Sequence, residues 1–261
     1  MTESKLHAMV KGEGTPVVLV HGFPFDGSIW QGQVDELSKD AHMIAPDTAG
    51  FGQSHDLPGD SKDATLDMYA DVLASTLKAN GQEKVVLVGH SMGGYMAFAF
   101  ARRHADMLLG LVLVATKAGA DTEAGREGRY KQAAGVEEKG AQVVVEGMLP
   151  KLFAPSTYEE KPELVEQIRG TMMNQNRHGI IAALYAMASR PDSTPTLAKI
   201  KVPVLILSGT EDAIIPAAEA DTMANGIKGS KHIAIEGAGH MLMLEEPEAF
   251  NSALRAFVKG I

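Results

Sequence analysis

The sequence contains no cysteine and a single tryptophan among its 261 residues. The lack of cysteine excludes disulfide bonds, thiolate metal sites and a cysteine nucleophile, although it favours the cytoplasm only weakly. No stretch reaches the roughly 18 apolar residues of a membrane span. The amino-terminal segment MTESKLHAMV also lacks the apolar core of a secretory signal. We therefore expect a cytoplasmic protein that does not contact a membrane.

Long runs of one charge are missing as well. The net charge of -9, with 22% charged and 45% hydrophobic residues, is typical of a globular protein. Because the acidic excess is spread along the chain, nucleic acid is not an expected partner. The nine histidines form no H-E-x-x-H pattern and no ligand spacing, so we predict no metal site.

Short apolar runs alternate with segments of helical period. The runs that we expect to be strands buried on both faces are 17–20, 42–46, 85–89, 111–116, 203–209 and 232–239. The helices expected between or after them are 65–80, 92–104, 216–227 and 247–259. This alternation predicts an α/β protein with a mostly parallel, doubly wound sheet. The opening HAMVKGEGTPVVLV instead predicts a hairpin turning at 12–14, which adds an antiparallel edge.

One segment interrupts the alternation. Residues 117–195 contain no convincing buried strand but include helix-like stretches such as PELVEQIRGTMMNQ and GIIAALYAMASR. We expect this segment to be a helical insertion that forms a lid, or cap, over the rest of the protein. The expected division is therefore a core of residues 1–116 and 196–261 and a cap of residues 117–195.

The run VVLVGHSMGG, residues 85–94, ends an apolar strand on Ser91. Gly89 and Gly93 complete a G-x-S-x-G pattern, which places a nucleophile on a sharp turn from strand to helix and leaves no room for a β-carbon beside it. A helix N-cap is the alternative for Ser91, but capping does not require glycine at both second neighbours. The nearby His21 and His90 are expected to hydrogen-bond the surrounding loops.

A nucleophilic serine needs a base, and the base needs a group that orients it. Asp212 follows one expected strand and His240 follows the last one, so both fall with Ser91 at the carboxyl ends of strands. The adjacent Glu211 and the more distant Asp121 are alternatives for the acid. His240 has the alternative of a structural loop histidine.

Four parts of the chain carry a resemblance to a known family: HGFP, DTAGFGQS, GHSMGG, and the pair GTEDAIIP and GAGHMLMLEEPEAF. The chain resembles the α/β-hydrolase superfamily, and within it the small bacterial carboxylesterases and the relatives of 3-oxoadipate enol-lactonase. The resemblance implies the α/β-hydrolase fold, with Ser91 as nucleophile, Asp212 as acid and His240 as base. It also implies an oxyanion hole formed by the backbone N–H groups of Phe23 and Met92.

Departures from other members of the superfamily narrow the expected chemistry. A serine at the turn argues against haloalkane dehalogenases and epoxide hydrolases, whose nucleophile is aspartate. Met241 stands where hydroxynitrile lyases of this fold carry lysine. We therefore expect a serine hydrolase that cleaves small to medium carboxylic esters through an acyl-enzyme, without a cofactor. A lactonase and a non-catalytic ligand-binding protein are the alternatives.

The expected substrate is a small ester or lactone, and its contacts are expected from the cap. The pocket candidates there are Met148, Phe153, Met172, Tyr185 and Met187. The cap also carries Arg126, Arg129, Arg169, Arg177 and Arg190. An arginine would suit the carboxylate of a lactonase substrate, but a solvated helix face explains these residues equally well. A homo-oligomer is compatible with the sequence.

Overall fold

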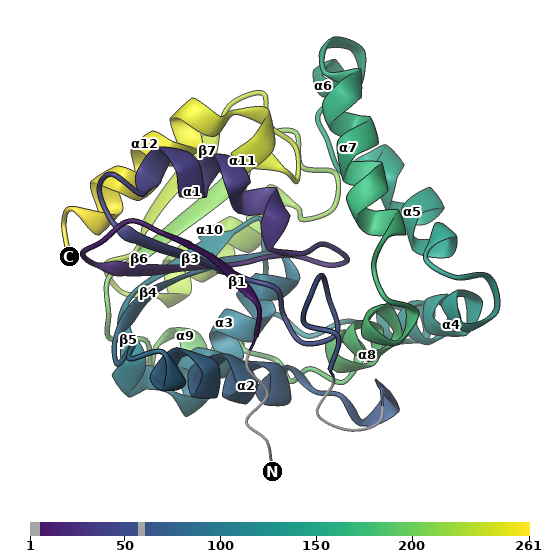
Figure 1. The fold of residues 1–261 in the computed structure, drawn as a ribbon, viewed down its shortest axis with the longest axis horizontal. Coiled ribbons are helices and arrows are strands. Elements are labelled where there is room, and N and C mark those ends of the chain that lie inside the picture. Colours follow the sequence, from purple (N-terminus) through teal and green to yellow (C-terminus); the bar gives the residue numbers. More distant parts are fainter. Residues whose placement is uncertain (1–5, 57–60) are drawn as a thin grey trace.

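The computed structural model describes residues 6–56 and 61–261, which form a seven-stranded sheet flanked by helices (Figure 1). The strand order is β1-β3-β2-β4-β5-β6-β7, and β1 with β3 is the antiparallel pair. In chain order the strands are Ala8–Lys11 (β1), Pro16–Val20 (β2), His42–Pro46 (β3), Val85–His90 (β4), Leu108–Val114 (β5), Val204–Gly209 (β6) and Lys231–Ile235 (β7). The predicted α/β class with a mostly parallel sheet is confirmed.

The antiparallel edge is also confirmed, but the predicted hairpin is wrong. β1 pairs with β3, in a register that places Ala8 opposite Pro46 and Lys11 opposite Met43. β2 already has a parallel partner on each side, β3 and β4. Because both of its edges are occupied, β2 cannot pair with β1. The chain still reverses direction at 12–14, but β3 lies between the two strands.

Helices cover both faces of the sheet (Figure 1). α1 packs against α12 on one face, while α2 and α3 pack together on the other, with α9 beside α3 and α10. Their bounds are Gln31–Leu37 (α1), Leu66–Ala79 (α2), Met92–Arg103 (α3), Thr194–Leu197 (α9), Ala217–Gly226 (α10) and Pro247–Val258 (α12). The four predicted helices correspond to α2, α3, α10 and α12. The short α1 was not predicted, because its QGQVDEL sequence shows too little apolar periodicity.

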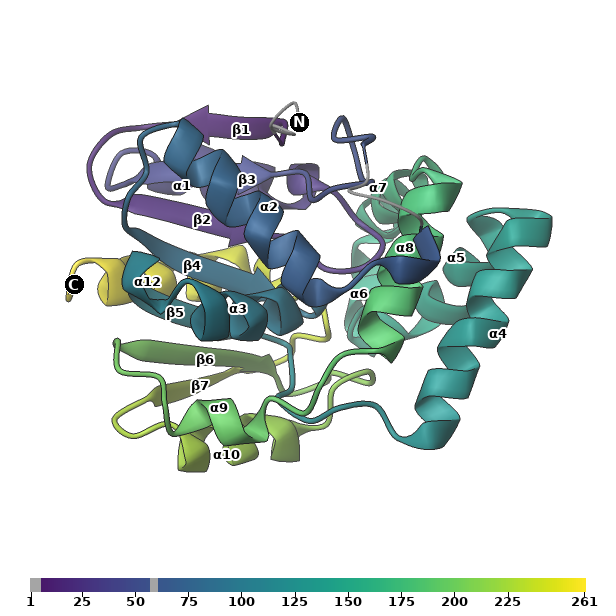
Figure 2. The ribbon, with the colours of Figure 1, turned by 90° about the horizontal axis from the view of Figure 1, so that it is seen from below.

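A run of helices lies between β5 and β6, beyond one end of the sheet (Figure 2). They are Glu123–Lys139 (α4), Gln142–Met148 (α5), Pro155–Glu160 (α6), Pro162–Met173 (α7) and Arg177–Ala188 (α8). The stretches PELVEQIRGTMMNQ and GIIAALYAMASR correspond to α7 and α8. The division of the chain into a core and a cap at residues 117 and 195 stays a prediction.

The central strands are buried on both faces, as their apolar runs predict. Every residue of β4 is buried. β7 differs because it forms an edge of the sheet: only Ile235 is buried, and the strand ends there rather than at the predicted residue 239. Since β4, β5, β6 and β7 are successive parallel neighbours, the segments that follow them meet at one end of the sheet.

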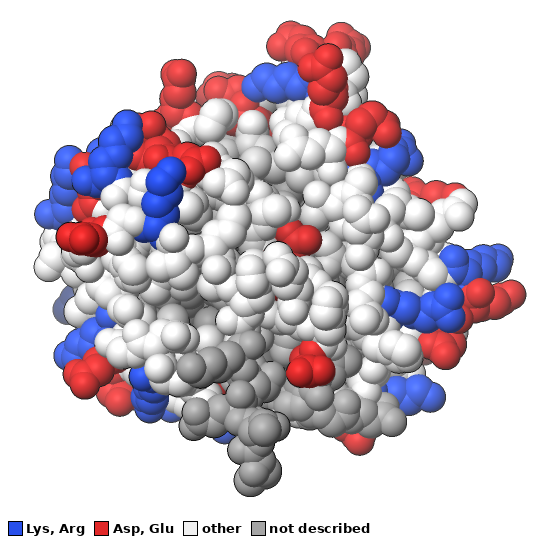
Figure 3. Space-filling model, viewed as in Figure 1, with Lys and Arg blue, Asp and Glu red and all other residues white. Residues whose placement is uncertain are grey.

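The surface mixes charges of both signs. In the view of Figure 3, basic and acidic side chains alternate around the rim of the molecule, and mostly uncharged residues occupy the centre. On this face the acidic excess of the sequence is therefore spread rather than gathered. Within the described ranges, none of the helices has both the length and the apolar composition needed to cross a membrane.

Candidate active site

Ser91 lies between β4 and α3, in the sharp turn that the sequence predicts. Its backbone has φ 52° and ψ -112°, a combination that residues with a side chain rarely adopt. The Ser91 N–H donates to the Val114 carbonyl oxygen at 2.9 Å, and the Thr116 hydroxyl donates to the Ser91 carbonyl oxygen at 2.8 Å. These bonds hold the strained turn, and the serine lines a cavity.

The glycines around Ser91 are required by the close approach of neighbouring backbones. A β-carbon on Gly89 would lie 2.4 Å from the Gly93 carbonyl oxygen. A β-carbon on Gly93 would lie 2.5 Å from the Val20 carbonyl oxygen. Both distances are too short for real atoms, so a larger residue would push α3 away from β4 or β2. The steric reason for the G-x-S-x-G pattern therefore holds in this chain.

The two amides expected to form an oxyanion hole come from different segments. Phe23 follows β2, and Met92 is the first residue of α3. A β-carbon on Gly22 would lie 3.1 Å from the Ser91 β-carbon, so the two segments touch beside the serine. In the described residues neither amide donates a hydrogen bond to the chain. Both N–H groups are therefore available to a substrate oxygen, and their catalytic role stays a prediction.

Asp212 and His240 meet beyond the ends of β6 and β7. His240 Nδ1 lies 2.9 Å from Asp212 Oδ2, and the two side chains are 1% and 2% exposed. Asp212 Oδ1 also accepts the amides of Ile214 and Ile215 at 2.8 and 3.0 Å. Burial alone would raise the pKa of Asp212, but the interactions with His240 and these amides hold that pKa below its usual value. The carboxylate therefore stays charged and orients the imidazole.

The alternative acids lie elsewhere. Glu211 is exposed. Asp121 pairs with Arg129 and Arg190, in an ion-pair cluster outside the His240 loop. Of the acids considered from the sequence, Asp212 is therefore the one in contact with His240.

The two other histidines near Ser91 are held uncharged. Burial lowers the pKa of His21, although its hydrogen bond to the Gly22 carbonyl opposes the shift. Burial, and then the charge of His240, lower the pKa of His90 to about 3. His90 Nε2 donates to the His240 carbonyl oxygen at 3.0 Å. Both residues hydrogen-bond loops, as expected, and neither is suited to accept a proton.

Ser91 and His240 both lie beyond the carboxyl ends of parallel strands, but no hydrogen bond joins them among the described residues. His90, which precedes Ser91, packs its ring 4.9 Å from the ring of His240. Bonds between a nucleophile and its base are often long in unliganded enzymes and shorten when substrate binds. Proton transfer from Ser91 to His240 therefore stays a prediction.

Ser91 opens into a cavity of about 330 Å³ between the end of the sheet and helices α4, α5 and α8. A volume of this order suits a small organic molecule. The lining residues are Phe23, Ser91, Tyr95, Arg129, Gln132, Gly147, Met148, Lys151, Met187, Ala213 and Ile214. The predicted nucleophile and one half of the predicted oxyanion hole therefore share a wall with residues of the inserted helices.

The predicted pocket residues separate into three groups. Met148 and Met187 line the cavity at Ser91. Phe153 and Met172 are buried in the hydrophobic core, 2% and 0% exposed. Tyr185 lines a different cavity, because residues two apart on a helix point to different sides, and Met187 takes the side that faces Ser91. The positions of Phe153, Met172 and Tyr185 therefore give no support to a contact with substrate.

Other lining residues were missed from the sequence. Tyr95 lies one helical turn after Ser91, so its spacing carried a readable signal. Ile214 lies two residues after Asp212, beyond the end of β6, so its position was also readable. Gln132 and Lys151 carried no signal, since their approach to Ser91 depends on how the inserted helices return to the sheet.

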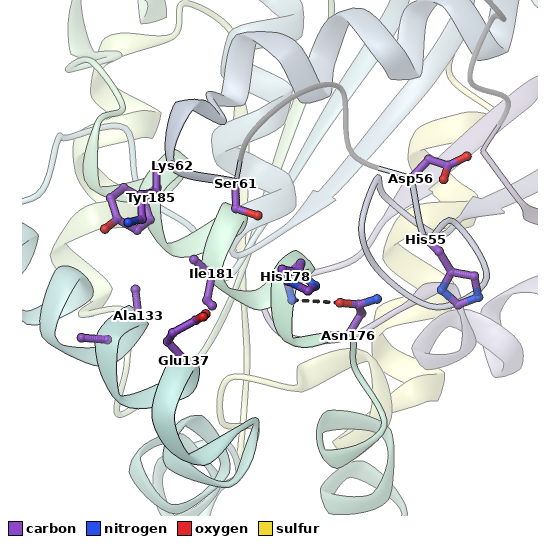
Figure 4. Close-up of a pocket in the computed structure, with 11 residues that line it drawn as sticks. His55, Asp56, Ser61, Lys62, Ala133, Glu137, Asn176, His178, Ile181 and Tyr185 are labelled. Carbon is purple, nitrogen blue, oxygen red and sulfur yellow. Dashed lines mark hydrogen bonds between the residues drawn. The ribbon is translucent and has the colours of Figure 1, made fainter.

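A larger cavity, of about 740 Å³, is lined by no residue of the predicted triad. Figure 4 shows it between Tyr185 and Ile181 of α8 on one side and the segment that holds His55 on the other. Neither His55 nor His178 pairs with a carboxylate in the described residues. Over the same residues, no group of three or more acids or histidines is placed to hold a metal ion. The smaller cavity is therefore the candidate active site.

Glu245 ties the loop of the predicted base to the inserted helices. One carboxylate oxygen, Oε1, accepts the Gly239 and Met241 amides at 2.9 and 3.2 Å. The other, Oε2, accepts the Ala154 amide at 2.7 Å and the Thr157 hydroxyl at 2.9 Å. Burial raises the pKa of Glu245, although these donors act in the opposite direction. The sequence analysis did not identify this shared acceptor.

Known proteins share this fold. A family model described as the alpha/beta hydrolase fold matches residues 15–247. A thermophilic esterase from Thermogutta terrifontis, solved with malate bound, is 41% identical, with a TM-score of 0.94 over 98% of this chain and 93% of its own. The enol-lactonase from Burkholderia xenovorans LB400 is 26% identical, with a TM-score of 0.89 over 97% of this chain and 96% of its own. An AB hydrolase superfamily protein of Bacillus subtilis (strain 168) is 32% identical over 94% of this chain and 92% of its own.

Proposed function

Because the chain belongs to the alpha/beta hydrolase fold family, we propose that it is a serine hydrolase that cleaves carboxylic esters of small to medium acyl groups. The observation that carries the proposal is the His240–Asp212 pair, 2.9 Å apart, at the same end of the sheet as a serine in a strained turn that lines a cavity. The esterase from Thermogutta terrifontis, at 41% identity, supports the ester as the substrate class.

The proposed reaction has two halves. Ser91 Oγ attacks the ester carbonyl carbon while His240 Nε2 takes the hydroxyl proton, and Asp212 stabilises the imidazolium that forms. The negative oxygen of the tetrahedral intermediate accepts the N–H groups of Phe23 and Met92. The C–O bond to the alcohol then breaks, and the alcohol leaves with the proton from His240. In the second half, water deprotonated by His240 hydrolyses the acyl-serine and restores the free hydroxyl.

A lactone is a second candidate substrate. It is an internal ester, so the same steps open its ring, and the alcohol stays attached to the acyl group. The similarity to the enol-lactonase of Burkholderia xenovorans LB400 is the observation that favours it.

The experiment is hydrolysis of p-nitrophenyl esters of increasing acyl length, run beside a panel of lactones. Ser91→Ala should lower kcat/KM at least about 10³-fold, because the triad acts as a unit. The matched control is Ser252→Ala, which removes an exposed hydroxyl on α12 and should change kcat/KM less than about twofold. Activity of Ser91→Ala within about tenfold of the wild type would contradict the proposal. No turnover of any ester or lactone would favour a ligand-binding protein instead.

A further inference from the structure

The charged side chains that line the cavity at Ser91 are of one sign. Two cationic side chains, Arg129 from α4 and Lys151 from the segment after α5, belong to its lining. No acidic residue does, in the part of the chain that the structure describes. In a chain with a net charge of -9, the charged residues that line the cavity at the candidate nucleophile are thus both cationic.

Arg129 is held in place by a cluster in which cations outnumber acids. Asp121, with a side chain 7% exposed, accepts hydrogen bonds from Arg129 and, at 2.8 Å, from Arg190. Lys117 Nζ lies 3.6 Å from the same carboxylate. Three cations therefore share one negative charge, and the cluster keeps a positive excess while it fixes the Arg129 guanidinium at the cavity wall.

One further contact brings positive charge toward Ser91. The Arg190 guanidinium lies 4.1 Å from the centre of the Tyr95 ring, and Tyr95 lines the cavity. Lys151 has no acid within ion-pair distance in the described residues, so the three N–H groups of its ammonium are left for a ligand or water. The cavity therefore offers an unpartnered cation at Lys151 and an anchored one at Arg129.

Building on the proposed ester hydrolysis, we propose that the substrate bears a carboxylate in addition to its scissile ester or lactone, and that Lys151 and Arg129 bind this carboxylate. Hydrogen bonds between a cationic donor and a carboxylate are roughly twice as strong as neutral ones. The substrate class is thus a half-ester of a dicarboxylic acid, or a lactone with a carboxylate side chain. The carboxylate takes no part in the bond changes, and serves to place the ester carbonyl at Ser91.

The test uses pairs of substrates that differ only in charge. Monomethyl succinate, glutarate and adipate are each compared with the methyl ester in which the free carboxylate is a carboxamide, and methanol release is followed by NMR. For the best chain length the wild type should favour the carboxylate by about tenfold or more in kcat/KM, equal to about 1.4 kcal/mol. Raising the ionic strength should reduce this preference, because salt screens an exposed cation such as Lys151.

Variants assign the preference to its residues. Lys151→Met should lower the ratio of the two kcat/KM values at least about fivefold, and Lys151→Glu should turn it in favour of the carboxamide. Lys139→Met is the matched control: it removes the same charge from an exposed position at the end of α4, outside the cavity, and should leave the ratio unchanged. Arg129→Gln should also lower the ratio, and Lys151→Met keeps the test valid if Arg129→Gln does not fold.

The outcomes separate this inference from the proposed function. A wild type that cleaves p-nitrophenyl acetate but treats each charged and neutral pair alike would overturn the carboxylate site and leave the esterase proposal intact. Equal losses of the ratio in Lys151→Met and Lys139→Met would also overturn it, since the effect would then be one of net charge. A wild type that cleaves none of these esters would overturn both.

Discussion

Replacing Glu245 with glutamine should destabilise the protein by an amount that its hydrogen bonds determine. The side chain keeps its shape, but one of its two acceptor oxygens becomes an NH₂ donor. If the remaining oxygen keeps the Gly239 and Met241 amides, the NH₂ group faces the Ala154 amide and the Thr157 hydroxyl. The hydroxyl can rotate and accept, but the amide cannot.

A single buried amide thus loses its acceptor, at a cost of about 1–3 kcal/mol. The opposite orientation would leave only the Gly239 amide without a partner, because the Met241 amide also donates to the Leu152 carbonyl oxygen at 3.2 Å. Either orientation therefore leaves one buried amide unpaired, and the expected loss is the same. For a chain of this size each kcal/mol lowers Tm by roughly 2–4 °C. The His240 and Met241 amides keep the Leu152 carbonyl oxygen in either orientation, so kcat should fall less than about tenfold.

Urea unfolding and calorimetry of Glu245→Gln measure this loss, with Glu246→Gln as the matched control. Glu246 is the next residue and is exposed, so its amide variant should differ from the wild type by no more than about 0.5 kcal/mol. Equal stability of the two variants would refute the reasoning from orphaned donors. A fully folded Glu245→Gln that has lost nearly all activity would refute the expectation that the bonds to the Leu152 carbonyl suffice to hold the His240 loop.

Three other changes test the neighbouring parts of the site. Asp212→Asn should keep KM and lower kcat by up to about 10⁴-fold, whereas Glu211→Gln should leave kcat near the wild type; the reverse pattern in ester assays would place the acid one residue earlier. Because the pKa of Asp212 lies below its ordinary value of 3.8 in the fold, its stabilising effect is present above that value and is lost as the pH falls through the folded pKa. The stability difference between the wild type and Asp212→Asn should therefore shrink below about pH 4, and a constant difference in acid unfolding curves would contradict this. Gly93→Ala places a β-carbon 2.5 Å from the Val20 carbonyl oxygen, so thermal unfolding should show that the free energy of unfolding falls by about 1–3 kcal/mol. A variant as stable as the wild type would show that the two backbones can separate without cost.

The elements nearest the chemistry were readable because their reasons are local. The strand that ends at Ser91 is a continuous apolar run, and the glycines around it meet backbone atoms of their own turn or of the adjacent strand. Asp212 and His240 follow strands in the same way. Patterns within about ten residues therefore sufficed to place them at one end of a parallel sheet.

The rest depends on contacts between segments that are distant in the sequence. The hairpin expected at 12–14 failed because β3, which comes later in the chain, occupies the position beside β2. The long helix α4 went unnamed, since only Ala133 and Val136 are buried on it and its apolar periodicity is weak. Lys151 reaches the cavity only because the chain after α5 returns toward Ser91. No local pattern reports such a return.

The assignment of Ser91 as an activated nucleophile can be tested by covalent labelling. The wild type is incubated with a fluorophosphonate, and the labelled residue is located by peptide mass spectrometry. The phosphonyl adduct should form on Ser91, be absent from Ser91→Ala and form far more slowly in Asp212→Asn, because the fluoride is displaced by a serine whose proton goes to His240. An adduct on another serine, or no adduct in an enzyme that still cleaves esters, would contradict the assignment.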